Sequence, residues 1–149
     1  MSDNWLQFIS VDPTWQPTPG AADSAAAFLR ALAPDSDEIN AEFKDEVEFF
    51  HPGANWSGVE CPSCGADAEG WWDDAMGVAA ERGFADLTVA APCCGAKTSL
   101  SDLRYVWPAA FGRFVLEAMN PNISEITAEQ ERRLADRLGT EFHTVWVHI

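Results

Sequence analysis

The four cysteines constrain this chain more than any other feature. They are the only cysteines among 149 residues, and they fall into two short runs, CPSCG at residues 61–65 and PCCG at residues 92–95. Two thiols that lie two residues apart on a turn closed by glycine can point at one ion, because the glycine lets backbone N–H groups turn toward the sulfurs. The pattern predicts a zinc ribbon or a pair of zinc knuckles.

The second run is displaced relative to the first. When the two Cys-Gly pairs are aligned, Ala91 stands where the partner of Cys94 is expected, and the extra thiol is Cys93. Neighbouring side chains of an extended backbone point to opposite faces, so both thiols can bind one ion only if the chain bends sharply here. The flanking proline and glycine allow such a bend. We expect one structural Zn²⁺ held by all four thiols, those of Cys61, Cys64, Cys93 and Cys94.

Two alternatives remain open at the level of sequence. In the first, Cys93 does not bind, and a fourth ligand such as His51 replaces it. In the second, the site is open, holds no metal or uses its thiols for redox chemistry. A catalytic zinc would need three protein ligands, a free position for water and a nearby base, for which the candidates are Glu60, Asp73 and Asp74. His143 and His148 fall on opposite faces of the last expected strand, and we expect both to be structural.

The charge of the chain is the second strong signal. Against 24 acidic residues stand 9 lysines and arginines, for a net charge of −15. Such a chain is repelled by phosphate backbones, which disfavours nucleic-acid binding and favours either a basic protein partner or a purely solubilising role. The first four residues carry no positive charge and no long apolar run follows, which predicts neither a signal peptide nor a membrane span and hence a cytoplasmic protein. In the cytoplasm, cysteines are more often metal ligands than disulfides.

Hydrophobic periodicity divides the rest of the chain into helices and strands. It predicts a loop at 13–20, strands at 5–11, 84–90, 111–119 and 142–149, an extended segment at 98–106, and helices at 21–33 and 70–82. A capping box at Thr127 and Gln130 opens a third helix that runs to Leu138. Gly83 and Gly139 stand where helix C-caps belong.

The acidic stretch 35–48 is ambiguous. It holds seven acids and one lysine, and its apolar residues fit both an alternating pattern and a helical stripe. We favour a strand that extends to Phe50, because residues 47–50 continue a β-prone run, and we expect the acids to lie on a solvated face. The order of elements then predicts an α+β fold of one domain, 1–149. It would be ferredoxin-like (β-α-β-β-α-β), or a related antiparallel sheet with helices, with a zinc-binding insertion at 52–108. The alternative is a larger antiparallel sheet that includes the strands of the zinc unit.

Other motifs are missing or structural. Residues 95–98, GAKT, have alanine at the glycine position that a P-loop ending requires, and no suitable glycine precedes them. Catalytic signatures such as G-x-S-x-G and H-E-x-x-H are absent from the sequence. Trp71, Trp72 and Trp107 flank the cysteine runs, and we expect them to form the small core that a metal module needs.

The chain resembles a family of small uncharacterised bacterial proteins, some of them labelled sugar-transporter ATPases. The residues that carry the resemblance are GANW at 53–56, CPSCG, the Trp71-Trp72 pair, PCCG, TSLSDL at 98–103 and YVWP at 105–108. It covers most of the chain and is densest from 49 to 121. The resemblance implies that the adjacent cysteine pair is a regular feature of the family and that both thiols have a role. It implies no activity.

The sequence therefore predicts a non-catalytic, zinc-binding acidic protein that engages a basic protein partner. In this hypothesis the zinc unit braces a display surface, and an immunity or antitoxin-like protein is one form that it would take. The alternatives are a zinc-dependent enzyme with an open metal site and a thiol-based redox or metal sensor.

Overall fold

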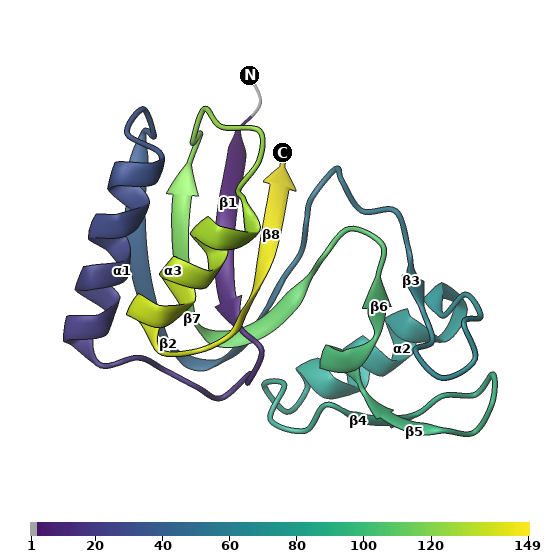
Figure 1. Ribbon diagram of the computed structural model, residues 1–149. Coiled ribbons are helices and arrows are strands. Elements are labelled where there is room, and N and C mark those ends of the chain that lie inside the picture. Colours follow the sequence, from purple (N-terminus) through teal and green to yellow (C-terminus); the bar gives the residue numbers. More distant parts are fainter. Residues whose placement is uncertain (1–2) are drawn as a thin grey trace.

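A four-stranded antiparallel sheet covered on one face by two helices forms the larger part of the molecule (Figure 1). The computed structural model describes residues 3–149; Met1 and Ser2, part of the N-terminus expected to lack a signal peptide, lie outside the described residues. The strand order is β2-β7-β1-β8. The strands are β1 (Asn4–Ser10), β2 (Glu38–Phe50), β7 (Ala110–Met119) and β8 (Phe142–His148), and the helices are α1 (Pro19–Leu32) and α3 (Ala128–Leu138).

Both covering helices begin at side-chain caps. The hydroxyl of Thr18 accepts a hydrogen bond from the N–H of Ala21 at 3.1 Å at the start of α1. At the start of α3, Thr127 and Gln130 form the predicted capping box, with reciprocal bonds of 3.1 and 2.9 Å. Gly139 ends α3 with a φ of 92°, a left-handed conformation that favours glycine. The capping box located α3 from sequence, whereas α1 was located by its apolar pattern and begins at Pro19, before the expected start at Ala21.

The ambiguous acidic stretch is a strand, as expected. Strand β2 pairs with β7 along its length, with a bulge between Phe43 and Glu48. Strand β2 lies at the edge of the sheet, and its five acids and the two just before it are all exposed: Asp35, Asp37, Glu38, Glu42, Asp45, Glu46 and Glu48. The helix-facing side of the sheet carries the main core, built from Leu6, Phe8, Leu29, Phe114, Leu116 and Leu134.

A smaller unit is inserted between β2 and β7 and lies beside the sheet (Figure 1). It contains a helix, α2 (Glu69–Ala80), a 3-10 turn, η1 (Leu100–Asp102), and two short antiparallel pairs. The first pair is β3 (Val59–Glu60) with β6 (Arg104–Tyr105), and the second is β4 (Thr88–Ala90) with β5 (Lys97–Ser99).

The inserted unit has a core of its own, which reaches into the ends of β2 and β7. Trp72 is buried, and its indole N–H donates to the Tyr105 hydroxyl at 3.2 Å, which in turn donates to the Leu100 carbonyl at 2.7 Å. Phe49 of β2 and Phe111 of β7 pack against the same cluster. The insertion and the sheet therefore share packed side chains, since the two strands that lead into the insertion supply part of its core.

A second junction ties the insertion to the far edge of the sheet. The segment Pro52–Ala54 runs beside the end of β8, where Ala54 N–H donates to the His148 carbonyl at 2.7 Å and His148 N–H donates to the Pro52 carbonyl at 3.2 Å. Gly53 has a φ of 67°, and a Cβ built on it would lie 2.3 Å from the His148 carbonyl oxygen. Only glycine fits this close backbone approach.

Some sequence expectations for the insertion are wrong. The strand expected at 84–90 covers only residues 88–90, because the chain turns at Phe84, which has a φ of 55°. Helix α2 has its C-cap at Glu81, with Gly83 two residues further on at a φ of 60°. Trp107 is 40% exposed and does not join the core that Trp72 fills and Trp71 borders. None of the helices in residues 3–149 combines the length and apolarity needed to cross a membrane.

Candidate metal centre

The structure brings all four cysteines together. Every pair of Sγ atoms lies within 4.8 Å, although the two runs are about thirty residues apart in sequence. The Cys61 and Cys94 sulfurs are 3.9 Å apart, and those of Cys64 and Cys93 are 3.4 Å apart. These separations are far longer than a disulfide bond of about 2.05 Å, and all four thiols are free.

The first cysteine run forms a tight knuckle. Cys61 N–H donates to the Ala66 carbonyl at 2.8 Å, and Gly65 N–H donates back to the Cys61 carbonyl at 2.9 Å. Gly65 has a φ of 76°, which reverses the chain so that it passes back beside its own start. This turn places Cys61 inside the protein and Cys64 at the surface.

The second run repeats this backbone. Ala91 N–H donates to the Ala96 carbonyl at 2.8 Å, Gly95 N–H donates to the Ala91 carbonyl at 2.7 Å, and Gly95 has a φ of 75°. Ala91 thus occupies the place of Cys61, and both are fully buried. The second knuckle therefore supplies its other thiol, beside that of Cys94, from Cys93. This residue corresponds to Ser63 of the first knuckle and is exposed.

The backbone of the first knuckle favours a thiolate. The N–H groups of Cys64 and Ser63 hydrogen-bond to the Cys61 sulfur and lower the pKa of that thiol to about 6. The pKa of Cys93 is raised to about 12, first by its hydrogen bond to Cys64 and then by partial desolvation at this exposed position. The four sulfurs cannot all ionise without a cation among them, because adjacent thiolates repel one another.

The donor set fits a tetrahedral cation of the zinc type. A Zn–S distance of about 2.3 Å in a tetrahedron separates the sulfurs by about 3.8 Å. The Cys64–Cys93 and Cys61–Cys94 sulfur separations, 3.4 and 3.9 Å, lie on either side of that value. A divalent cation would release the thiol protons and compensate the resulting charge.

The other candidate ligands and bases lie apart from this cluster. Within the described residues, no histidine or carboxylate belongs to it. His51, the alternative fourth ligand, stacks on Trp56 with ring centroids 5.0 Å apart, and its Nδ1 accepts a hydrogen bond from the Gly53 N–H. Glu60 forms an ion pair with Arg104 at 3.7 Å.

The remaining candidates occupy other surfaces. Asp73 and Asp74 are exposed on α2. His143 is half-buried on β8, where burial lowers its pKa, and the ring of His148 shares a hydrogen bond with the side chain of Asn4 at 2.7 Å. None of these four side chains is part of the sulfur cluster in residues 3–149.

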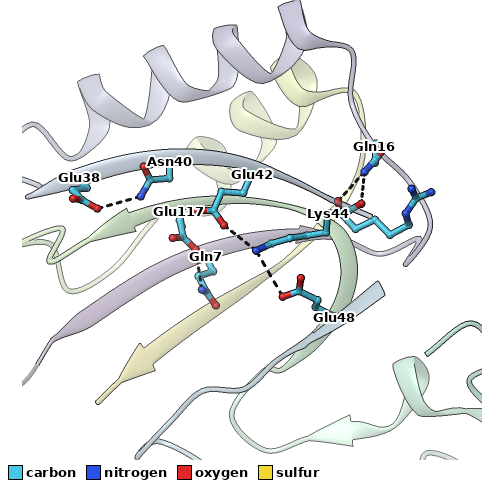
Figure 2. Close-up of polar contacts among 9 residues, drawn as sticks. Gln7, Gln16, Glu38, Asn40, Glu42, Lys44, Glu48 and Glu117 are labelled. Carbon is cyan, nitrogen blue, oxygen red and sulfur yellow. Dashed lines mark hydrogen bonds and ion pairs between the residues drawn. The ribbon is translucent and has the colours of Figure 1, made fainter. Parts of the chain in front are cut away.

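A second polar cluster lies on the sheet, on strands β1, β2 and β7 (Figure 2). Gln7 donates to the Glu117 carboxylate at 3.1 Å, and Lys44 lies 2.9 Å from Glu42 and 3.7 Å from Glu48. Glu117 is 8% exposed, and burial raises its pKa. Sequence reasoning missed this residue: alternation along β7 placed its side chain opposite the apolar face but gave no sign that it is covered.

Comparisons with known proteins add no homologue to this picture. No family model matches the chain, and neither a curated protein nor a solved structure gives a significant match. The function is therefore argued from the residues and their geometry.

Proposed function

We propose that this protein is a non-catalytic zinc protein in which a closed four-thiolate site braces the inserted unit. The observation that carries the proposal is the convergence of four free Sγ atoms within 4.8 Å of one another. Four sulfur ligands complete a tetrahedral Zn²⁺ site and leave no position for a reacting water. Such a site supplies structural stability and no Lewis-acid chemistry.

The metal would link two turns that carry little other structure. The knuckles at 61–65 and 92–95 adjoin only the short strands β3, β4 and β5. The insertion between β2 and β7 is shorter than about 70 residues, and units of this size usually depend on a metal or a disulfide. In this proposal the two knuckles form a zinc ribbon. The larger part, with elements in the order β1-α1-β2-β7-α3-β8, is a ferredoxin-like sandwich that carries it.

We further propose that the acidic edge of the sheet engages a basic protein partner in the cytoplasm. All seven acids of residues 35–48 are exposed, and Phe43 among them is 46% exposed. Acidic side chains on an edge strand also block unwanted strand pairing, so charge alone does not establish a partner. A surface that joins dense negative charge to an exposed aromatic ring suits a basic partner, as in an immunity or antitoxin-like protein.

Metal analysis of the purified protein tests the first part of the proposal. We expect close to one zinc per chain, and weaker zinc binding when Cys61 or Cys64 is replaced by serine. A protein that contains no zinc after purification in its presence would refute it. Capture of basic proteins from a native lysate at low salt, with release at high salt, tests the second part.

A redox role is the second candidate, because three of the four thiols are exposed. A sensor would release zinc on treatment with stoichiometric peroxide as its thiols oxidise. A structural site should keep its metal under the same conditions.

A further inference from the structure

The sheet face opposite α1 and α3 contains a cavity that the metal centre does not use. The cavity measures about 290 Å³ and lies between this face and the segment Phe49–His51, which leads into the insertion. Its lining combines a buried carboxylate with aromatic rings: Trp5, Gln7, Phe49, Phe50, His51 and Glu117.

Glu117 is the acidic residue that lines this cavity. It lies in one row across the sheet with Gln7 of β1 and Asn40 of β2. Gln7 donates to one carboxylate oxygen at 3.1 Å. The Lys44 ammonium forms its ion pairs with Glu42 and Glu48, and it affects Glu117 through its nearby charge, which lowers the pKa of that carboxyl (Figure 2). Burial is the larger effect and raises this pKa, because a buried carboxylate without an ion-pair partner is costly.

The aromatic residues that line the cavity also suit a bound cation. His51 accepts a hydrogen bond at Nδ1 from the Gly53 N–H, so this nitrogen carries no proton. Burial lowers the pKa of the ring, which favours the form that does not repel positive charge. Its ring packs edge-on against Phe49 at 5.9 Å between centroids. The faces of Trp and Phe attract ammonium groups, more strongly where water is excluded.

We propose that this cavity receives a lysine side chain of the basic protein partner, with the ammonium at Glu117 and the aliphatic stem against Trp5 and Phe49. This inference rests on the proposed function and identifies where the partner docks. The exposed acids of β2 border the same face and would steer a basic surface toward it. A cavity of this size fits one side chain. The buried carboxylate should bind a side chain that ends in a cation more tightly than an apolar side chain of equal length.

The test uses the zinc-loaded full chain and two small probes. Nα-acetyl-lysine amide presents the side chain, and Nα-acetyl-norleucine amide is its neutral counterpart. Binding is followed by NMR through the Trp5 indole and Gln7 side-chain amide signals. We expect saturable shifts with the lysine probe, with a dissociation constant on the order of 1 mM, and binding of the norleucine probe at least about tenfold weaker.

Two variants with the same change of charge locate the site. Glu117→Gln should weaken binding of the lysine probe at least about tenfold. Asp45→Asn removes an exposed acid of β2 that does not line the cavity, and it should change affinity by less than about twofold. Thermal unfolding of Glu117→Gln serves as the folding control, and we expect no loss of stability because the variant removes a buried charge.

The proposal is overturned if Glu117→Gln binds the lysine probe as well as the original protein, if norleucine binds equally, or if Asp45→Asn loses as much affinity as Glu117→Gln. These titrations decide the cavity by themselves. Capture of basic proteins at low salt decides the wider proposal separately, since a partner that docks elsewhere would still be captured by Glu117→Gln.

Discussion

Removing one thiol from the second knuckle should weaken zinc binding, and placing a thiol at another position of the same knuckle should restore it. Cys93→Ser removes one of four ligands, and Ala91→Cys introduces a thiol at the place that Cys61 holds in the first knuckle. The two knuckles match closely: Cys61 and Ala91 donate to their carbonyl partners at the same 2.8 Å, and the two glycines have φ values of 76° and 75°. A thiol at position 91 should therefore point at the metal as Cys61 does.

The size of the effect follows from the number of ligands. Structural zinc sites bind with about 10–16 kcal/mol, so one ligand of four accounts for about 2.5–4 kcal/mol. That share corresponds to about a 60- to 700-fold loss of zinc affinity in Cys93→Ser. The double variant Ala91→Cys/Cys93→Ser should recover most of it and bind within about tenfold of the original protein.

Competition with a zinc chelator of known affinity measures all the variants. Ser63→Ala is the matched control, because Ser63 occupies in the first knuckle the position of Cys93 in the second, and it should not change zinc affinity. If Cys93→Ser binds zinc as tightly as the original protein, Cys93 is not a ligand. If the double variant stays as weak as Cys93→Ser, the two knuckles are not equivalent.

Three further predictions concern the frame that holds the site. Gly53→Ala should destabilise the protein by about 2–4 kcal/mol, because a Cβ at this position meets the His148 carbonyl and φ is positive. Gly77→Ala, at an exposed position of α2 with open space around it, should instead stabilise the protein by about 0.5–1 kcal/mol. Chemical denaturation in excess zinc measures both changes. Thr127→Ala should cost about 1 kcal/mol by removing the capping box of α3, and Thr14→Ala, outside any helix, serves as the comparison. The raised pKa of Glu117 means that the folded state binds a proton more tightly than the unfolded state. Protonated Glu117 therefore stabilises the fold below the ordinary carboxyl pKa of 4.5, and this stabilisation is lost as pH rises through the pKa of the folded state. Glu117→Gln should remove this part of the pH dependence of unfolding; an unchanged profile would show that the carboxyl is not buried in solution.

Local chemistry made much of the fold predictable from sequence. Thr127, Gln130 and Gly139 are capping residues with defined roles, and they located α3 within the chain. The CPSCG run specified its own turn, because the glycine supplies the left-handed residue that closes it. These signals act within a few residues, and so they survive without knowledge of the tertiary structure.

Features that depend on distant parts of the chain were missed. Nothing near Glu117 in sequence shows that Phe49–His51 lines the same cavity as this carboxyl. The docking of Pro52–Ala54 on β8 joins residues almost a hundred positions apart. Phe84 adopts a turn conformation although its β propensity favours a strand, because the chain reverses between α2 and β4. Such outcomes are set by tertiary packing, which no local pattern records.

The coordination sphere of the bound metal decides whether the site is closed by four thiolates. X-ray absorption at the zinc edge of the purified protein counts the ligand atoms and measures their distances. A closed structural site predicts four sulfur atoms at about 2.3 Å and no lighter neighbour in the first shell. A spectrum with one or more nitrogen or oxygen ligands at about 2.0–2.1 Å would contradict the account, because it would mean an open or mixed site in place of the four thiolates of Cys61, Cys64, Cys93 and Cys94.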